Sequence, residues 1–484
     1  MDSTLGSRPH VVVIGGGASG LAAARRLLQQ EPRPRITVIE SDSQFGGKIR
    51  TERIDDFVIE GGPDSFLAGK PRGVGLATEL GLGDDLIGVT PQRHRAFILY
   101  RDVFHPIPEG LTGLVPTKLG PVARSGLLSP RGKARLALDY VLPRHDAADE
   151  ALGAFVRRRL GDEAWERLVE PLMAGIYAAN GDQLSLAATF PQLQAAEREH
   201  GGLIKGVVAA RQKAPASSGP ARPPFLTPAG GLGTLIEVLT DQLQRDGAVL
   251  RDETRALSVN RVASGGKYLY EIALAEGLPL RADAVILATP AHVTSALVSG
   301  LDRALSRELA EIPHASTVIV TLAFRAEQFV RPLTGHGYVV PRVMGGPVLA
   351  CTWSSRKWEG RAPDGWELLR VFLGRSGNGE ALLEFDDETL LAIAQAEVAT
   401  RLGASGAPAL SRVQRWPKGM PQYILGHPQR VARIERAVVD HAGLELAGNA
   451  LRGVGVPDVI RSGEDAAERV LQKLRTWEPI GAVM

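Results

Sequence analysis

The chain has 484 residues, of which 44% are hydrophobic and 23% are charged, a composition typical of a globular protein with two or three domains. Its formal net charge of +2 argues against a protein that binds nucleic acid through bulk charge. The only cysteine, Cys351, excludes a disulfide framework, a cysteine-rich metal site and a redox-active dithiol.

The sequence contains no apolar run near the ~18–20 residues that span a bilayer. The first ten residues, MDSTLGSRPH, lack a basic region followed by an apolar core, so we expect no secretory signal. These two features predict a cytoplasmic protein.

A nucleotide-binding pattern begins near the N-terminus. Residues Val11–Ile14 form an apolar, β-branched run that predicts a strand buried on both faces. The run leads into Gly15, Gly17 and Gly20, whose spacing suits a tight turn, a close approach to a pyrophosphate and helix-to-strand packing. Apolar residues from Leu21 to Leu28 recur at helical spacing, so a helix N-terminus would face the phosphates.

A second predicted strand, 36–39, ends at Glu40. Glu40 lies twenty residues after Gly20, where a carboxylate can accept hydrogen bonds from a ribose diol. Strand, glycines, helix, strand and acid in this order predict a dinucleotide site.

The next motif narrows the dinucleotide to FAD. Residues 46–51, GGKIRT, resemble the second glycine signature of flavin amine oxidase-like proteins, although the chain has Gln44 where that family has an arginine. The resemblance implies that the backbone of Gly46 and Gly47 and the side chain of Lys48 line the FAD diphosphate. A basic surface turn is the alternative.

A glycine pair also ends the next predicted strand, within residues 57–66, which indicates close approach of the backbone to another group. The family resemblance implies that this segment passes near the isoalloxazine ring. Lys70 and Arg72 follow, and they are equally well explained as contacts for an anionic substrate or as solvated loop cations.

From Pro106 the sequence predicts an inserted helical subdomain with basic and apolar faces. One helix is expected over 130–142, with Ser129 as its N-cap and Pro130 at its first position. The mixed face is favoured as an ordinary solvated surface. Contact with a membrane surface or with a partner protein is the alternative.

Residues 171–191 closely resemble the porphyrinogen oxidases of haem biosynthesis. The resemblance implies that a small residue and an aromatic residue of this loop wall a tetrapyrrole pocket, which places Gly175, Ile176 and Tyr177 there. Residues 205–224 then read as a loose basic connector that contains Ser217, Ser218, Gly219 and Pro220.

Residues 225–236 resemble the segment in which this family returns to the flavin domain. The predicted strand 282–287, followed by Ala288 and Thr289, resembles the strand that supports the adenine side of FAD in this superfamily. No second glycine motif of the dinucleotide type is present, so reduced flavin would be reoxidised by oxygen or another acceptor rather than by a nicotinamide.

Residues 348–427 contain predicted structural elements and candidates for the substrate site. Cys351 lies in an apolar strand-like run, 348–353, and is interpreted as a small core residue, and a helix is expected over 387–402. Residues 352–358 and 420–427 resemble the porphyrinogen oxidases of Gram-positive type. Tyr423 and His427 are candidates for the pocket and equally for structural hydrogen bonding.

The C-terminal motif, 446–463, is shared by porphyrinogen oxidases and carotenoid desaturases. Pro457 can begin the last helix, whose N-terminus would face the flavin N1/C2 edge and stabilise the negative charge gained there on reduction.

The predicted site therefore consists of many FAD contacts and a smaller substrate wall, with no metal. The predicted FAD-binding residues are Gly15, Gly17, Ala18, Ser19, Gly20, Glu40, Gly46, Gly47, Lys48, Gly61, Gly62, Pro63, Asp64, Ser65, Ala288, Thr289, Gly448, Gly453, Val454, Gly455, Val456 and Pro457. The predicted substrate pocket contains Lys70, Gly175, Ile176, Tyr177, Tyr423 and His427, and Arg72, Lys205 and Arg356 are further candidates for holding carboxylates. No catalytic side chain is assigned, because the chemistry is carried by flavin N5.

The resemblance spans residues 11–471 and implies FAD-dependent oxidation of coproporphyrinogen III to coproporphyrin III. This is a six-electron reaction in three flavin cycles, with non-covalent FAD, oxygen as acceptor and hydrogen peroxide as product. Protoporphyrinogen IX oxidation is the main alternative. More distant alternatives are a carotenoid desaturase, a flavin amine oxidase and a non-enzymatic flavin-holding protein. The partner protein considered for the helical insertion would then be another haem-pathway enzyme. The oligomeric state stays open.

We expect an α/β fold with a discontinuous Rossmann-like FAD-binding domain, a mixed α+β substrate domain and the helical insertion. The expected boundaries are FAD-binding 1–70, substrate 71–105, helical insertion 106–200, connector 201–224, FAD-binding 225–295, substrate 296–428 and FAD-binding 429–484.

Overall fold

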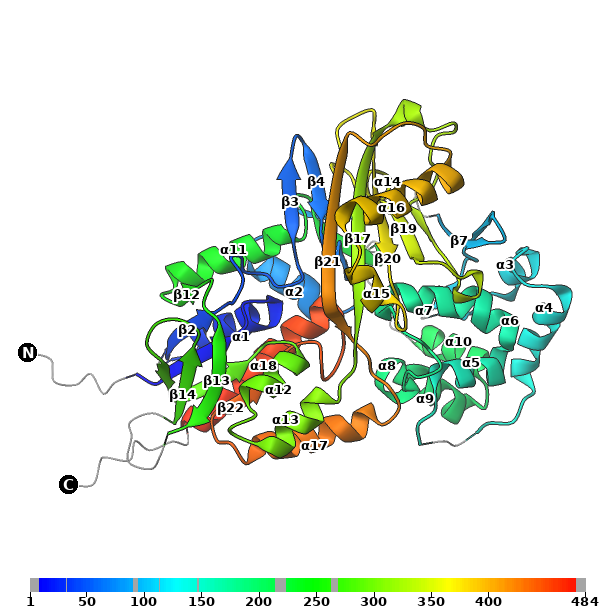
Figure 1. Cartoon of the computed structure of the whole chain (residues 1–484). Coiled ribbons are helices and arrows are strands. Elements are labelled where there is room, and N and C mark those ends of the chain that lie inside the picture. Colours follow the sequence, from blue (N-terminus) through cyan, green and yellow to red (C-terminus); the bar gives the residue numbers. More distant parts are fainter. Residues whose placement is uncertain are drawn as a thin grey trace, which may run out of the picture.

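The computed structural model describes residues 8–31, 33–89, 95–112, 114–145, 148–213, 223–262 and 269–475. A parallel sheet with its helices lies beneath an upright seven-stranded sheet, and a group of helices packs to one side of both (Figure 1). The fold is mixed α/β. No helix within the described ranges is both long enough and apolar enough to cross a membrane.

The parallel sheet is assembled from parts of the chain that are far apart in sequence. Its strand order is β12-β2-β1-β16-β22, and every neighbouring pair is parallel. The strands are β1 (His10–Ile14), β2 (Arg35–Ile39), β12 (Val249–Arg251), β16 (Ala284–Leu287) and β22 (Leu444–Leu446). The strands predicted at Val11–Ile14 and 36–39 are confirmed as β1 and β2, and β1 lies in the centre of the sheet.

Alternate residues of β1 enter two different hydrophobic cores. Val11 and Val13 pack with the helices on one face, whereas Val12 and Ile14 pack with the helices and small antiparallel sheet on the other. The first face carries α1 (Ala18–Leu28), α2 (Pro71–Glu79), α11 (Gly233–Arg245) and α18 (Val456–Arg475). The second carries β13 (Ala256–Arg261), β14 (Tyr270–Leu274), β15 (Leu280–Ala282), α12 (Ala291–Leu297), α13 (Arg303–Ala310) and α17 (His427–Val439). Burial on both faces explains the continuous apolar run of β1.

The seven-stranded sheet has the order β21-β17-β20-β19-β18-β7-β8, and only the β18–β7 pair is parallel. Its strands are β7 (Ala96–Tyr100), β8 (Val103–Pro106), β17 (His314–Arg325), β18 (Gly337–Val339), β19 (Val348–Trp353), β20 (Trp366–Leu373) and β21 (Leu410–Pro421). Cys351 is fully buried in β19, and α16 spans Asp387–Leu402, so both predictions are confirmed.

Small elements lie in the chain between or beside the strands of the two large sheets. They are β3 (Thr51–Ile54) with β4 (Phe57–Glu60), β5 (Phe66–Leu67) with β6 (Leu86–Gly88) and β11 (Phe225–Pro228), and the short helices α14 (Ser354–Lys357) and α15 (Gly379–Leu383). The turn from β4 to β5, residues 61–65, therefore lies between the two sheets in the chain path.

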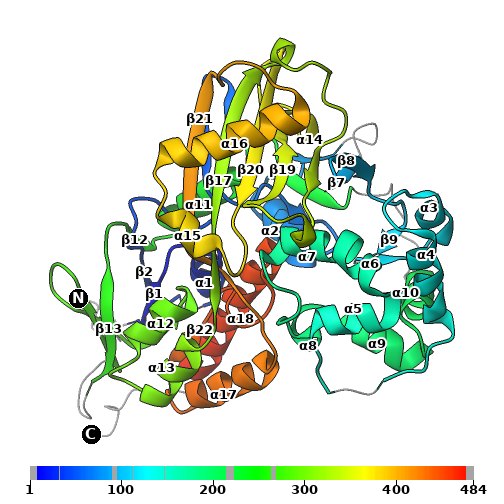
Figure 2. The same ribbon diagram turned by 45° about the vertical axis from the view of Figure 1, so that its right-hand side comes forward.

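The helical group has its own hydrophobic core. It contains α3 (Leu119–Arg124), α4 (Pro130–Ala137), α5 (Leu152–Leu160), α6 (Asp162–Ala164), a π-helical turn (Trp165–Val169), α7 (Glu170–Tyr177), α8 (Leu186–Thr189), α9 (Pro191–His200) and α10 (Leu203–Lys213), together with the strand pair β9 (Leu111–Thr112) and β10 (Val115–Pro116). Figure 2 shows α7 between this group and the upright sheet, where it contacts β18 and β19.

The predicted N-cap of α4 is confirmed, since the Ser129 side chain accepts a hydrogen bond from the Gly132 N–H at 3.1 Å. The helix is shorter than predicted. It ends at Ala137 and continues as a 3₁₀ turn over Leu138–Tyr140 instead of reaching Leu142.

The prediction of a loose connector from residue 205 is wrong for its first part. Residues Leu203–Lys213 form α10, with Leu203, Ile204 and Val207 buried against α9. These apolar residues stabilise the helix despite the basic composition that suggested a linker. Residues 214–222 of the predicted connector, including Ser217, Ser218, Gly219 and Pro220, lie outside the described residues.

Candidate functional site

The turn from β1 to α1 is closed so tightly that it requires glycine. Gly15 has φ +107° and its N–H donates to the Ile39 carbonyl at 2.8 Å. A Cβ on Gly20 would lie 1.9 Å from the Gly15 carbonyl oxygen. Gly17 caps α1 without any side-chain hydrogen bond, and a Cβ there would meet only Gly47 at 3.8 Å. The first turn of α1, with Ala18 and Ser19, therefore presents backbone N–H groups that no side chain caps, as an anion site requires.

The second glycine motif lies directly against the first. The Gly46 N–H donates to the Gly16 carbonyl at 2.8 Å, and Gly46 and Gly47 both have positive φ. On the other side, a Cβ on Gly15 would lie 2.8 Å from the carbonyl oxygen of Ala288, which precedes Thr289 at the end of β16. The three segments that the sequence assigned to one nucleotide thus meet in space.

Glu40 lies at the end of β2, beside this turn. Its Oε2 accepts from the Gly16 N–H at 2.8 Å, and its Oε1 accepts from the Asp42 N–H at 3.0 Å. The carboxylate is therefore fixed at the edge of the glycine turn, with acceptor capacity left for a diol.

Lys48 is a cation without a charged partner among the described residues. Burial lowers the pKa of Lys48 to about 8, and no carboxylate offsets that effect. A buried cation of this kind is costly alone and is stabilised by an anion. A diphosphate beside Gly46 and Gly47 would supply that negative charge, so these residues fit a dinucleotide such as FAD.

The turn after β4 packs on the backbone of the second motif. A Cβ on Gly62 would lie 1.8 Å from the Lys48 carbonyl oxygen, so only glycine fits there. The Gly61 N–H donates to the Arg50 carbonyl at 2.8 Å. Residues 61–65 are thereby held against the loop that contains Lys48.

The side chain of Asp64, a predicted cofactor-binding residue, is directed into the protein. Its carboxylate accepts from Lys357 Nζ at 2.9 Å and from Trp358 Nε1 at 3.1 Å. Ser65 Oγ donates to the same carboxylate at 2.7 Å. Because its carboxylate is bound within the protein, Asp64 would contribute to a cofactor site through its backbone.

The C-terminal motif reaches the same turn through α18. Gly448 has φ +119°, its N–H donates to Ser462 Oγ at 3.0 Å, and a Cβ on it would lie 3.8 Å from Ser19 Oγ. A Cβ on Gly463, within α18, would lie 1.9 Å from the Ser19 carbonyl oxygen. Sequence reasoning missed Gly463. An isolated glycine inside a helical pattern was the available signal, because such a glycine often has a packing reason.

The start of α18 differs slightly from its prediction. The helix begins at Val456, with Pro457 in its first turn, and the Gly455 carbonyl accepts from the N–H groups of Asp458 and Val459 at 3.0 Å each. A Cβ on Gly453 would lie 2.5 Å from Asp458, and Val454 packs at the edge of the helical-group core.

Lys70 meets the first turn of α18. Its Nζ lies 2.5 Å from Asp458 Oδ2, in an ion pair whose lysine side chain is 44% exposed. The neighbouring Arg72 is bound by Glu464 at 2.6 Å and by Glu79 at 2.7 Å. Of these two loop cations, Lys70 is thus the more accessible one.

The end of α7 presents the predicted substrate wall. Gly175 is exposed, with only Val339 Cγ1 at 3.8 Å from its Cβ position, and the Ile176 side chain is 45% exposed. Tyr177 is buried, and its burial together with the nearby Asp458 raises its pKa to about 12. This helix end therefore lies near the Lys70–Asp458 pair, with Gly175 and Ile176 directed to open space.

Tyr423 and His427 are buried and structural in their contacts. Their rings stack with centroids 4.2 Å apart. The Tyr423 hydroxyl donates to the Asn449 carbonyl at 2.5 Å, and His427 Nε2 lies 2.9 Å from the Leu451 carbonyl oxygen. They hold the C-terminal motif in place, which is the structural alternative left open by the sequence.

This burial predicts a pH-dependent stability. Burial lowers the pKa of His427 to about 4, from 6.5. Between these pH values the unfolded chain binds a proton that the folded chain excludes, so the free energy of unfolding falls as pH is lowered from 6.5 to 4, by about 2–3 kcal/mol.

Urea unfolding tests this prediction. The free energy of unfolding should differ less between pH 5 and pH 7 for His427→Gln than for the unmodified chain. Part of the difference will remain, because burial also lowers the pKa of His314 to about 4. An unchanged difference would contradict the assignment.

Two further cations suggested for carboxylates are already bound within the protein. Lys205 Nζ donates to the Tyr140 carbonyl at 2.7 Å, far from the other site residues. Arg356 Nε donates to the buried Glu367 at 2.8 Å. Neither side chain lies free beside α7.

Sequence reasoning also missed a buried charge cluster behind α7. Glu170, at the start of this helix, accepts from the Arg342 N–H at 2.9 Å and lies 3.9 Å from Arg375 Nη1. Arg342 Nη2 in turn donates to the Ala179 carbonyl at 3.0 Å. The cluster ties the end of α7 to the upright sheet. No local pattern marks it, because its members come from three distant segments.

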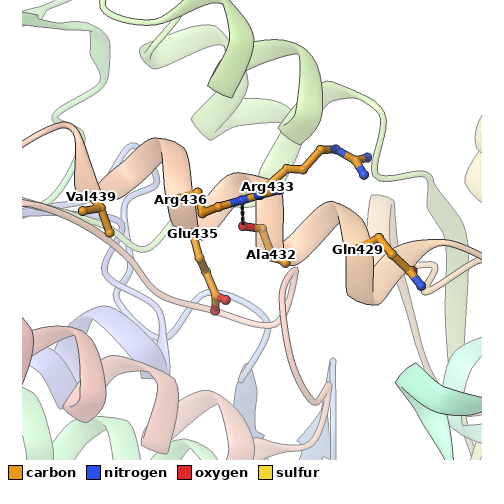
Figure 3. A pocket seen from close by; sticks show the side chains of 6 residues that line it. All are labelled: Gln429, Ala432, Arg433, Glu435, Arg436 and Val439. Atoms are coloured by element: carbon orange, nitrogen blue, oxygen red, sulfur yellow. Dashed lines mark hydrogen bonds between the residues drawn. The ribbon is translucent and has the colours of Figure 1, made fainter.

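A separate hollow of about 600 Å³ lies over the outer face of α17 (Figure 3). It is lined by Gln429, Ala432, Arg433, Glu435, Arg436 and Val439. Arg433 is bound to Glu308 at 2.7 Å, and Arg436 Nε donates to the Ala432 carbonyl of its own helix at 3.3 Å. None of the residues assigned to the nucleotide or substrate lies here.

Residues 18–471 match the family described as flavin containing amine oxidoreductase. The chain belongs to this family. It is an FAD-dependent oxidoreductase, and the glycine turns and Lys48 described above are suited to that cofactor.

Within the family, the chain belongs with the porphyrinogen oxidases. It is 35% identical to a coproporphyrinogen III oxidase of Bacillus subtilis (strain 168), over 96% of this chain and 99% of that protein. It is 38% identical to a coproporphyrinogen III oxidase of Propionibacterium freudenreichii subsp. freudenreichii, over 96% of this chain and 91% of that protein. A crystal structure from Exiguobacterium sp. 255-15, assigned as a protoporphyrinogen oxidase, superposes with a TM-score of 0.84 at 34% identity and covers 97% of this chain and 99% of that one.

Proposed function

We propose that this porphyrinogen oxidase converts coproporphyrinogen III to coproporphyrin III in haem biosynthesis, with oxygen as acceptor and hydrogen peroxide as product. The observation that carries the proposal is the near-full-length identity, 33–38%, to three bacterial coproporphyrinogen III oxidases. The identity to a protoporphyrinogen oxidase of Nicotiana tabacum is 29%, which makes protoporphyrinogen IX the second candidate substrate.

The FAD site in this proposal is the meeting point of the glycine turns. The α1 N-terminus and Lys48 would hold the diphosphate, Glu40 the ribose, and the backbone of residues 61–65 and 453–457 the flavin. The parallel sheet with its helices would form the discontinuous FAD-binding domain, the seven-stranded sheet the substrate domain and the α3–α10 group the insertion. The exposed residues Gly175 and Ile176 at the end of α7, together with the first turn of α18 near Tyr177, support the arrangement.

The substrate would lie between α7 and the flavin. Gly175 leaves room for a flat macrocycle, Ile176 gives an apolar contact, and Lys70 would bind a propionate in exchange for part of its contact with Asp458. Bound FAD accepts two electrons at a time, so a six-electron oxidation takes three cycles. The chain's own residues position the macrocycle and exclude water, because electron-rich pyrroles stabilise positive charge without a strong protein base.

The test is aerobic turnover of the FAD-loaded protein on coproporphyrinogen III and protoporphyrinogen IX side by side, followed by porphyrin fluorescence. A higher kcat/KM for coproporphyrinogen III is expected. Preference for protoporphyrinogen IX would replace the proposed substrate by the second candidate. Absence of turnover on both, with FAD bound, would refute the proposal.

Lys70→Met tests the substrate wall. A charge-assisted hydrogen bond contributes about 1.5–3 kcal/mol, so we expect kcat/KM for coproporphyrinogen III to fall about tenfold or more. The fall should be smaller for protoporphyrinogen IX, which has fewer carboxylates, and Lys70→Arg should retain most of the activity. Lys205→Met is the matched control, since Lys205 binds only the Tyr140 carbonyl and ring. Equal losses in the Lys70→Met and Lys205→Met proteins would contradict a role for Lys70.

A further inference from the structure

Two side chains of the seven-stranded sheet donate hydrogen bonds to the backbone of the 61–65 turn. Trp416 Nε1, on β21, donates to the Gly61 carbonyl at 2.8 Å. Arg370 Nη2, on β20, donates to the Gly62 carbonyl. Both carbonyls are thus directed into the sheet, and the position of the turn depends on a layer that is distant in sequence.

Asp64 is the centre of this contact. Its carboxylate lies 2.9 Å from Lys357 Nζ and 3.5 Å from Arg370 Nη1. The side chains of Asp64, Lys357 and Arg370 are 12%, 16% and 2% exposed. Burial alone would raise the pKa of Asp64, but Lys357 and Arg370 outweigh burial and hold that pKa well below its usual range. The two cations therefore favour the ionised form of Asp64.

Positive charge exceeds negative charge in the buried surroundings of the turn. The next carboxylate, Glu60, lies 3.9 Å from Arg361 Nη2, so three cations face two carboxylates. Arg361 and Arg370 are both buried. Water screens such charges poorly, and their field therefore extends to groups packed against the turn.

We propose that Asp64, Lys357 and Arg370 form a positioning cluster that fixes the 61–65 turn against bound FAD and sets the electron affinity of the flavin. The inference rests on the proposed placement of this turn beside the flavin. Reduction makes the flavin more negative, so the net positive charge of the cluster stabilises the reduced state, and the Asp64 carboxylate limits that stabilisation.

Two of the three charges of the cluster, those of Asp64 and Lys357, can be removed separately. Lys357 donates to both oxygens of Asp64, at 2.9 and 3.1 Å, and packs over the Trp358 ring without bonding the turn backbone. Lys357→Met thus removes one positive charge while the Trp416 and Arg370 bonds remain. Asp64→Asn removes one negative charge and keeps a group of the same size.

The experiment measures the midpoint potential of FAD bound to the full-length protein by spectroelectrochemical titration. Asp64→Asn should raise the ratio of reduced to oxidised flavin at a fixed potential about tenfold, a shift of about +30 mV for a two-electron couple. Lys357→Met should lower this ratio by a similar factor. The ratio in Lys357→Arg protein and in the Asp64→Asn/Lys357→Met double variant should be close to that of the unmodified protein. Arg412→Met is the control, because Arg412 on β21 forms an exposed pair with Glu52 on β3 at 2.7 Å, and no shift is expected.

Opposite shifts that cancel in the double variant would support the cluster. Shifts of the same sign, or no shift in protein that retains FAD, would overturn it. If Asp64→Asn fails to retain FAD, Lys357→Met alone decides: a lowered potential supports the inference and an unchanged potential overturns it. Opposite shifts in a protein that oxidises neither porphyrinogen would uphold the cluster while refuting the proposed substrate.

Discussion

Gly62→Ala is expected to lower the affinity for FAD about 100-fold, because displacement of a binding group by about 1 Å has effects of that order. The added Cβ would lie 1.8 Å from the Lys48 carbonyl oxygen, and no rotamer change can relieve a contact between Cβ and backbone. Either the 61–65 turn or the Gly46–Lys48 loop must move, and both are placed at the proposed cofactor site. The measurement is a fluorescence titration of the purified apoprotein with FAD.

Gly69→Ala is the matched control for this prediction. Gly69 follows the same turn, and no atom lies within 4 Å of its Cβ position. The affinity of the Gly69→Ala protein for FAD should equal that of the unmodified protein. Circular dichroism must show that Gly62→Ala protein is folded. A folded Gly62→Ala protein with unchanged affinity would place the turn away from FAD.

Asp139→Ala is expected to lower the free energy of unfolding by about 3–5 kcal/mol, as removal of one member of a buried ion pair does. Asp139 is fully buried in the helical group, and its carboxylate accepts from Arg159 Nε at 2.6 Å and from the Ile204 N–H at 2.7 Å. The substitution removes the nearer of two carboxylates from the buried Arg159 guanidinium, leaving Glu197 at 3.3 Å, and it removes the acceptor for the first turn of α10. The measurement is urea unfolding at pH 7.

Asp241→Ala serves as the comparison for this second prediction. Asp241 and Arg245 form an exposed pair on α11 with 3.8 Å between Oδ2 and Nη2. Such surface pairs contribute little, so the change should stay within about 0.5 kcal/mol. Similar effects for the two aspartates would show that the helical group does not depend on its buried ion pair.

Local backbone chemistry made part of this fold predictable. The β-branched run of β1, the glycine spacing after it, the Ser129 N-cap and the α16 helix each depend on residues close in sequence. Propensity, capping and steric fit at glycine act over a few residues, and the same signals therefore marked the glycine turn of the candidate nucleotide site. The wrong prediction of a linker at α10 shows the limit, because three apolar residues that pack on α9 outweighed a basic, connector-like composition.

By itself the sequence determined the dinucleotide turn, the class of cofactor and the elements that carry them. Only the tertiary structure decided that Asp64 is directed into the upright sheet, that Tyr423 and His427 support the C-terminal motif, and that Lys70 pairs with Asp458, 388 residues away. The physical reason is that a polar side chain can satisfy its charge or hydrogen bonds with many partners. Which partner it meets depends on how distant strands and helices pack, whereas a glycine turn is fixed by the atoms of its own segment and its immediate neighbours.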